Sequence, residues 1–384
     1  MDSYWNNFLQ KITKQKDLAS IGFANVVGGA ISGIFWLYIA SIINPESYGE
    51  IHYFIGIAGI AQVISLIGSS NVLTVYTAKN VKIHSTLFLV SIIAAVISAL
   101  VIIIIFYRFD AALLALGYVI FELLNAVLLG KKLFVKYSKF FIIQKILTLT
   151  LGIGFYYTLG VDGIILAIAL SFIPYFVLFI SEFRETKIDF SLLRPRKGFI
   201  INNYVMSMLG TSGSQIDKLI IAPLLGFALL GNYSLALQIF TVMLMFSMIV
   251  YKYILPQDAS GKSNKTLKSV IVLISIGISV LGIVLSPLVI PDLFPKYIET
   301  IDAIQIMSVA VVPGTIILLY TSKLLGLEKS RFVLISKAIS LSMLVTGFII
   351  LGPIFGITGL ASVFVFTVTF EASFLFGISK IKRL

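Results

Sequence analysis

The stretch Ser138-Lys-Phe-Phe-Ile-Ile-Gln-Lys145-Ile-Leu-Thr-Leu-Thr150 recurs 192 residues later as Ser330-Arg-Phe-Val-Leu-Ile-Ser-Lys337-Ala-Ile-Ser-Leu-Ser342. Five of the thirteen positions are identical, and five more exchange similar residues. Shortly after each copy, Gly160-Val-Asp-Gly163 corresponds to Gly356-Ile-Thr-Gly359. Apolar residues align by chance in a leucine-rich chain, so the inference depends on the matched lysines, hydroxyls and glycines. They predict a chain built from two tandem copies of one unit.

The composition indicates that both copies lie in a membrane. Of the 384 residues, 59% are hydrophobic and 12% are charged, and the mean hydropathy is +1.04. A soluble domain has about twice that share of charged residues, so this chain has too little polar surface to face water on all sides. Its apolar runs of roughly 18 to 25 residues match a helix that crosses a hydrocarbon core of about 30 Å.

The sequence therefore predicts an all-α membrane protein with about twelve transmembrane helices in two parallel six-helix repeats. The expected spans are residues 18–43, 51–76, 85–107, 111–130, 140–159, 163–182, 199–225, 228–250, 268–290, 301–323, 332–351 and 357–378. Pro174 and Pro313 fall inside two of them and are expected to kink those helices. The predicted domains are an N-terminal lobe (1–182), a basic cytoplasmic linker (183–198) and a C-terminal lobe (199–384).

The positions of the basic residues predict the orientation. Of the 29 lysines and arginines, 24 lie in the tails and in the loops after every second span, whereas the opposite loops hold only Arg108 and Lys296. Basic residues stay cytoplasmic in membrane proteins. We therefore expect a multi-pass protein of the cytoplasmic membrane with both termini in the cytoplasm. The net charge of +12 then faces anionic lipid headgroups, not nucleic acid.

Signals for enzymes, cofactors and metals are missing from the sequence. The chain has no cysteine, and its two histidines, His52 and His84, are expected as separate polar residues at the membrane interface. Gly261-Lys-Ser263 lacks the upstream glycine of a phosphate-binding loop, because Pro256 stands there. We expect no cofactor, no metal site and no enzymatic activity.

Six ionisable residues fall inside the predicted spans, where each could cost roughly 3 kcal/mol at mid-helix. Lys145 and Lys337 are equivalent in the repeat, and each has a hydroxyl three residues later, Thr148 or Ser340. One interpretation is a pair of cations that bind an anionic headgroup in a central cavity. The other is that both lysine side chains extend toward the nearby membrane–water interface, so that their ammonium groups stay in water.

The other four ionisable residues are Asp217, Lys218, Glu122 and Glu371. Lys218 is a third candidate for headgroup binding, and the three acids are candidates for ion coupling or gating. Adjacent helical residues point about 100° apart, so we do not expect Asp217 and Lys218 to neutralise each other. An alternative is that the three bases and three acids pair entirely and leave no cationic cavity.

Six stretches carry a family resemblance: Leu18-Ala-Ser-Ile-Gly-Phe-Ala-Asn25, Phe35-Trp-Leu-Tyr-Ile-Ala-Ser41, Tyr48-Gly-Glu50, Val75-Tyr-Thr-Ala-Lys79, Asp217-Lys218 and Leu225-Gly-Phe-Ala-Leu-Leu-Gly231-Asn-Tyr-Ser234. They resemble the polysaccharide biosynthesis (O-antigen flippase-like) family of the multidrug/oligosaccharidyl-lipid/polysaccharide (MOP) exporter superfamily. The resemblance implies a MATE-like fold of two lobes with a V-shaped central cavity. It also implies a flippase for polyprenyl-(di)phosphate-linked oligosaccharides, with membrane lipids, the lipid-linked glycan and glycan-synthesis enzymes as partners.

Two alternatives to the flippase stay open. A cation-coupled exporter of drugs or small solutes has the same fold, although the acidic ion-coupling residues common in the first span of that branch are missing here. A membrane-embedded glycan polymerase or ligase needs large extracytoplasmic loops, and no loop predicted on that side exceeds about a dozen residues.

Overall fold

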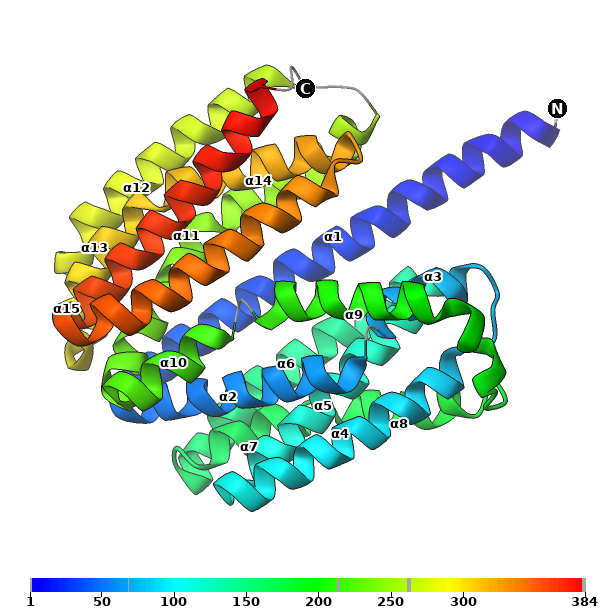
Figure 1. The fold of residues 1–384 in the computed structure, drawn as a ribbon, viewed down its shortest axis with the longest axis horizontal. Coiled ribbons are helices and arrows are strands. Elements are labelled where there is room, and N and C mark those ends of the chain that lie inside the picture. Colours follow the sequence, from blue (N-terminus) through cyan, green and yellow to red (C-terminus); the bar gives the residue numbers. More distant parts are fainter. Residues whose placement is uncertain (1, 68, 213–214, 261–263, 382–384) are drawn as a thin grey trace. The chain divides into compact units, whose positions relative to one another are not determined.

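The computed structural model describes residues 2–67, 69–212, 215–260 and 264–381, and within these ranges the chain is helical, without strands (Figure 1). The first half contains α1 (Asp2–Ile42), α2 (Pro45–Leu66), α3 (Ser69–Ala78), α4 (His84–Phe106), α5 (Phe109–Gly130), α6 (Phe134–Leu159), α7 (Gly163–Leu170) and α8 (Ile173–Phe183). Two short 3-10 helices follow, η1 (Phe190–Leu192) and η2 (Arg194–Arg196). The second half contains α9 (Lys197–Ser212), α10 (Ile216–Leu225), α11 (Phe227–Ala259), α12 (Lys265–Leu293), η3 (Pro295–Tyr297), α13 (Thr300–Val309), α14 (Val311–Gly326) and α15 (Ser330–Ile381).

The predicted membrane spans correspond to these helices. In the described part of the chain, nine helices are long and apolar enough to cross a membrane, or ten if the bent pair α13 and α14 is one span. α15 divides at Gly356, whose backbone is not helical, into the two last predicted spans. α9 and α10 together cover the predicted span 199–225. Gly261-Lys-Ser263 lies outside the described residues.

The predicted kink at Pro313 is confirmed, and at Pro174 the structure shows a short break between two helices of one span. α7 ends at Leu170, and Pro174 stands in the first turn of α8. Pro313 lies in the first turn of α14, which is bent by 41° from α13. Proline lacks a backbone N–H and is tolerated in the first turn of a helix, so each span breaks just before it.

The glycine pairs of the internal repeat have the same structural role in both halves. Gly160 and Gly356 both have a positive φ, 73° and 58°, which a side chain would strain. Gly163 and Gly359 both lie against a backbone carbonyl eight residues earlier: a Cβ would stand 2.8 Å from the oxygen of Phe155 and 2.4 Å from that of Leu351. The same tight helical hairpin therefore precedes the last span of each half, which supports the predicted duplication.

Contacts divide the chain into two compact units whose limits differ from those of the predicted lobes. The first unit consists of Met1–Phe35 and Phe54–Ser212, and the second of Trp36–Tyr53 and Gly213–Leu384. Residues 36–53 thus belong to the unit formed mainly by the second half. Conversely α9, although it follows the linker, belongs to the first unit, where the Tyr204 hydroxyl donates to the Ile64 carbonyl at 3.3 Å.

In the first unit the core is built around α5. This helix contacts α3, α4, α6, α7 and α8 and buries Leu123, Leu124 and Val127. α4, in contrast, exposes Ile97, Leu100 and Ile104, as expected for a helix with one face in lipid.

In the second unit, α14 packs against both α11 and α15. The backbones of α2 and α11 also meet closely there: a Cβ on Gly49 would stand 1.9 Å from the Phe227 carbonyl oxygen, and one on Gly231 would stand 1.8 Å from that of Pro45. Only glycine permits this approach.

Candidate functional site

Lys145 lies in α6 and is packed in the first unit. Its ammonium nitrogen is 5.5 Å from the centre of the Phe141 ring, one turn toward the N-terminus of α6. Gly28 of α1 makes room for both side chains, because a Cβ there would be 2.4 Å from Phe141 Cε1 and 3.3 Å from Lys145 Cγ. Among the described residues, no carboxylate forms an ion pair with Lys145. The aromatic face therefore supplies a cation–π contact, which leaves the charge itself uncompensated.

Thr148, the hydroxyl that was predicted to act beside Lys145, is part of an internal polar network. Gln144 Nε2 donates to Thr148 Oγ1 at 2.9 Å and to Ser171 Oγ at 3.0 Å, and Thr148 Oγ1 donates to Ser171 Oγ at 3.0 Å. All three side chains are buried. The network fastens α6 to the break between α7 and α8. Gln144 and Ser171 were not singled out from the sequence, although Gln144 stands inside the repeated stretch.

Lys337, the repeat equivalent of Lys145, has different surroundings. Its side chain is exposed and close enough to Glu371 for a charge interaction. Ser340 is buried beside the same carboxylate. The structure therefore brings three predicted site residues together within α15, one cation, one acid and one hydroxyl.

Asp217 and Lys218 correct one sequence expectation, because they do pair with each other. Lys218 Nζ is 3.1 Å from Asp217 Oδ1, and the Lys218 backbone N–H donates to the same oxygen at 2.8 Å. Both side chains are buried. The angular argument failed because the pair lies in the first turn of α10, not in mid-helix, and the long lysine stem folds back. A helix N-terminus also favours the carboxylate.

Glu122 is held inside the first unit. Its Oε1 accepts a hydrogen bond of 2.7 Å from the Ser70 hydroxyl of α3. One turn away on α5, Asn125 Oδ1 accepts from the Tyr175 hydroxyl at 3.2 Å. These contacts connect α5 to α3 and to α8.

Both histidines are buried within the protein. In the second unit the His52 ring lies 4.6 Å from Trp36 and 4.5 Å from Tyr48, measured between ring centres. This aromatic cluster was not predicted. Tyr48 and His52 lie one turn apart on α2, but Trp36 reaches them only when α1 and α2 pack together.

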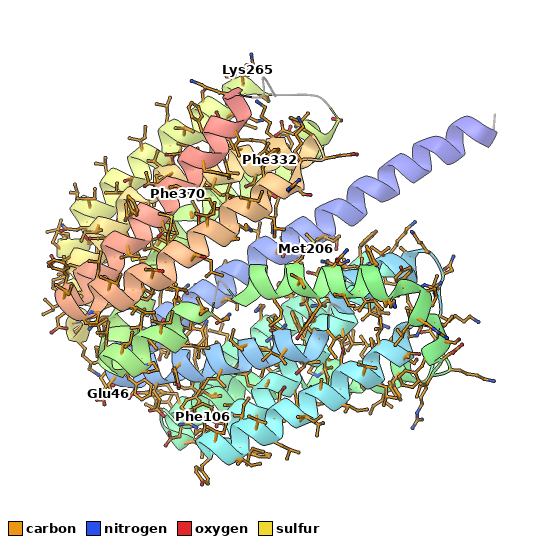
Figure 2. The ribbon with its side chains drawn as sticks, in the orientation of Figure 1. Glu46, Phe106, Met206, Lys265, Phe332 and Phe370 are labelled. Atoms are coloured by element: carbon orange, nitrogen blue, oxygen red, sulfur yellow. The ribbon has the colours of Figure 1, made fainter. Side chains whose placement is uncertain are left out.

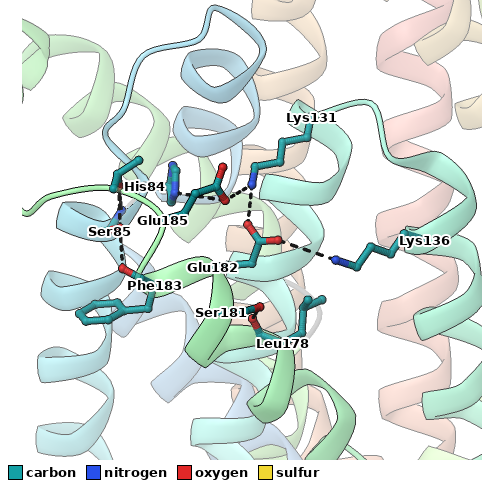
Figure 3. A network of polar contacts seen from close by, with 10 residues as sticks. His84, Ser85, Lys131, Lys136, Leu178, Ser181, Glu182, Phe183 and Glu185 are labelled. Carbon is teal, nitrogen blue, oxygen red and sulfur yellow. Dashed lines mark hydrogen bonds and ion pairs between the residues drawn. The ribbon is translucent and has the colours of Figure 1, made fainter.

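His84 belongs to an ion-pair network that joins three loops of the first unit (Figure 3). Lys131 Nζ donates to Glu182 at 2.7 Å and also contacts Glu185, while His84 Nε2 lies 4.0 Å from the Glu185 carboxylate. Lys136 Nζ is 3.9 Å from Glu182. The network closes the end of the first unit that the charge pattern predicts to be cytoplasmic.

The electrostatic states of this network follow from its contacts. Burial lowers the pKa of His84 and outweighs the neighbouring carboxylates. Burial opposes the charge of Lys131, but the hydrogen bonds with Glu182 and Glu185 outweigh it and raise the pKa of Lys131. The Lys131 hydrogen bond lowers the pKa of Glu185. These contacts thus favour a neutral His84 beside a charged Lys131 and a charged Glu185.

The sequence matches no protein-family model and no curated protein, whereas the fold is similar to solved transporter structures. One is the inward-facing conformation of a multidrug resistance MATE family transporter of the MOP superfamily, with a TM-score of 0.69, 18% identity, and coverage of 94% of this chain and 95% of that chain. The outward-facing conformation of such a transporter gives a TM-score of 0.61 at 16% identity, with 96% of each chain covered.

A third similar structure is a MOP superfamily transporter from Pyrococcus furiosus, with a TM-score of 0.61, 16% identity, and coverage of 96% of this chain and 95% of that chain. Its binding pocket is described as having a reverse polarity that suggests a different function. This chain resembles these structures over nearly their whole length, and they are transporters, not enzymes. The chain is thus a multi-pass membrane protein with the fold of the MATE transporters of the MOP superfamily.

Proposed function

We propose that the protein is a transporter that flips a polyprenyl-(di)phosphate-linked oligosaccharide across the cytoplasmic membrane by alternating access between two lobes. The observation on which this proposal rests is Lys145, a cation inside a predicted span for which the described residues offer an aromatic face but no ion-paired carboxylate. An uncompensated ammonium in a membrane protein favours an anionic ligand. A diphosphate headgroup is such a ligand.

Two further observations support the substrate class. Asp217 and Lys218 neutralise each other, so this buried pair adds no net charge to the second unit. A MOP transporter of similar fold is described as having a binding pocket of reverse polarity, which is consistent with a cationic site on this fold. We propose that Lys145 and Lys337 bind the headgroup and that Ser340 lies beside the sugar-phosphate. Lys218 binds the headgroup only if its ion pair with Asp217 opens. Thr148 acts there only if its hydroxyl leaves the Gln144 network.

Alternating access is supported by two observations. The chain forms two compact units, and similar structures have been solved in inward-facing and outward-facing conformations. We assign coupling to an ion gradient to Glu122 and Glu371, because the Asp217 carboxylate is paired with Lys218. We therefore expect transport to proceed without ATP and to respond to a proton or sodium gradient.

The second candidate function is cation-coupled export of drugs or small solutes. It is favoured by the description of the inward-facing neighbour as a multidrug resistance transporter and by the acids Glu122 and Glu371. The two candidates predict opposite ligand charges, because a cationic drug requires a net negative site.

One experiment separates these candidates. Proteoliposomes that contain the full chain would be loaded in parallel with a fluorescent polyprenyl-diphosphate oligosaccharide or with an organic cation such as ethidium. We expect gradient-dependent translocation of the glycan lipid and none of the cation. Translocation of the cation alone would establish the exporter and overturn the flippase.

The orientation is tested separately. Reporter fusions after α3, α5, α8, α11 and α14 are all expected to report the cytoplasm, as are fusions at both termini. A clear extracytoplasmic signal from any of these sites would contradict the two-times-six arrangement.

A further inference from the structure

The second unit contains a cavity of about 1110 Å³ between α12, α14 and the last part of α15. Its walls are mainly apolar and include Val272, Leu273, Ile316, Leu319 and Phe376. Leu273 and Phe376 are exposed, so part of this wall lies at the surface of the unit. Because every lining residue belongs to the second unit, the cavity exists whatever arrangement the two units adopt.

One end of the cavity is strongly basic. Lys265 and Lys268 come from the first turn of α12, and Lys323 comes from the last turn of α14. The charges of Lys265 and Lys268 both act on Lys323, and so does the Asp258 carboxylate. Figure 2 shows Lys265 toward the same end of the unit as Phe332, at the start of α15, which is the end predicted to be cytoplasmic.

The hydrogen bonds at this end leave an excess of positive charge. Lys268 Nζ donates to both oxygens of Asp258, at 2.7 and 2.9 Å, and the Ser322 hydroxyl donates to Asp258 Oδ2 at 2.7 Å. Lys323 Nζ donates to the Ser379 hydroxyl at 2.9 Å. Among the described residues, one carboxylate therefore faces three lysines. Their mutual repulsion at the edge of an apolar cavity favours an additional anion.

The shape of the cavity shows what kind of anion fits. The lining residues of α12 run from Lys265 to Ser279, about 20 Å along the helix at 1.5 Å per residue. The apolar part of one leaflet is about 15 Å deep, which is half of the hydrocarbon core of the bilayer. The cavity thus offers a cationic end at headgroup level and an apolar wall at acyl-chain level, which is the pattern of a phospholipid.

We propose that this cavity binds an anionic phospholipid of the cytoplasmic leaflet, whose phosphate contacts Lys265 and Lys323 and whose acyl chain lies along α12, α14 and α15. The site is separate from Lys145 and Lys337 and does not depend on the proposed transport function. It would keep a bilayer lipid bound to the second unit whatever the protein transports.

The test measures binding of phosphatidylglycerol to the purified full-length protein by native mass spectrometry, with phosphatidylcholine and inorganic phosphate as parallel probes. We expect one retained phosphatidylglycerol and no comparable retention of the other two. The Lys265→Ala/Lys323→Ala variant is expected to lose roughly tenfold to thirtyfold in affinity. The matched control, Lys329→Ala/Arg331→Ala, removes two charges from the same predicted side without touching the cavity lining and is expected to bind normally.

Two more variants test whether misfolding explains a loss of lipid binding. Lys265→Arg/Lys323→Arg preserves the charge and is expected to retain binding. Ser373→Trp narrows the apolar part while leaving the lysines, and is expected to weaken retention of the lipid. Equal binding by wild type and the double alanine variant, equal retention of phosphatidylcholine, or undiminished binding by Ser373→Trp would each overturn the lipid site.

Discussion

Lys145 and Lys337 occupy equivalent places in the internal repeat, yet their surroundings differ. Lys145 is packed against Phe141 and Gly28, and the hydroxyl three residues on belongs to a buried network with Gln144 and Ser171. Lys337 is exposed and lies beside Glu371. Duplication has thus preserved the position of the cation but not its electrostatic compensation. The two halves are therefore expected to contribute unequally to binding of an anion.

The largest expected effect comes from removing the uncompensated cation. Lys145→Ala is expected to reduce glycan-lipid translocation about ten- to hundredfold, because a charge-assisted hydrogen bond contributes roughly 1.5–3 kcal/mol. Lys145→Arg is expected to retain part of the activity, and Lys145→Glu to be worse than alanine. Lys139→Ala, on the same helix but exposed, is the control. Normal translocation by Lys145→Ala at normal membrane levels would favour the alternative in which the lysine simply extends to the interface.

The hydroxyl positions give the second test. Thr148→Val leaves Gln144 and Ser171 without a shared buried partner and is expected to lower the free energy of unfolding by about 1–3 kcal/mol. Ser340→Ala, its repeat equivalent, is expected to cost less. Thermal unfolding in detergent compares the two variants. Equal losses would mean that the two hydroxyls contribute equally to stability and would remove the asymmetry.

The Lys337–Glu371 interaction is expected to show a smaller coupling. Lys337→Ala leaves the acid uncompensated, and adding Glu371→Gln is expected to restore part of the lost stability. A double-mutant cycle is expected to give a coupling free energy of about 0.5–1 kcal/mol, since Lys337 is exposed. Strict additivity would show that the two groups do not interact and that Lys337 is as uncompensated as Lys145.

The smallest effect concerns pH at the predicted cytoplasmic ends of the two units. The lowered pKa values of His84 and Glu185 stabilise the first unit at neutral pH. This stabilisation is lost as the pH falls below about 6.5 for the histidine and below about 4.3 for the carboxylate, their unfolded values. The Lys268–Asp258 pair of the second unit has no such histidine among its described contacts. Between pH 7 and pH 5, His84→Asn is expected to flatten the fall in melting temperature by a few degrees at most, whereas Lys268→Met is expected not to change its slope.

The sequence was sufficient to predict the helices and the duplication, because long apolar runs and matched glycines follow from simple constraints. Gly160 and Gly356 show this best, since a backbone with positive φ selects glycine in both copies. The place of a break within a span was less predictable where no proline marks it. The start of α10 is the clearest case, and missing it caused the wrong expectation for Asp217 and Lys218.

The partners of the candidate site residues could not be predicted from the sequence. Ser171 reaches Thr148 across 23 positions and two helices, and Glu371 approaches Lys337 only because α15 folds back at Gly356. Such pairs depend on helix rotation and packing, which periodicity does not specify in a chain that is apolar on most faces. The sequence therefore identified which residues carry charge inside the membrane but not which of them are neutralised.

The assignment of residues 36–53 to the second unit, and of α9 to the first, has a consequence for the integrity of the chain. Lys296 Nζ donates to the Ile42 carbonyl at 3.0 Å in one unit, and the Phe199 and Tyr76 rings lie 5.6 Å apart in the other. Each sequence half therefore contributes one segment to the unit formed mainly by the other half, and we expect that neither half folds fully alone. If the chain is cut within residues 183–198, we expect the two fragments to regain their structure only when residues 36–53 and α9 can each pack in the unit formed by the other fragment. The two fragments must therefore be made together.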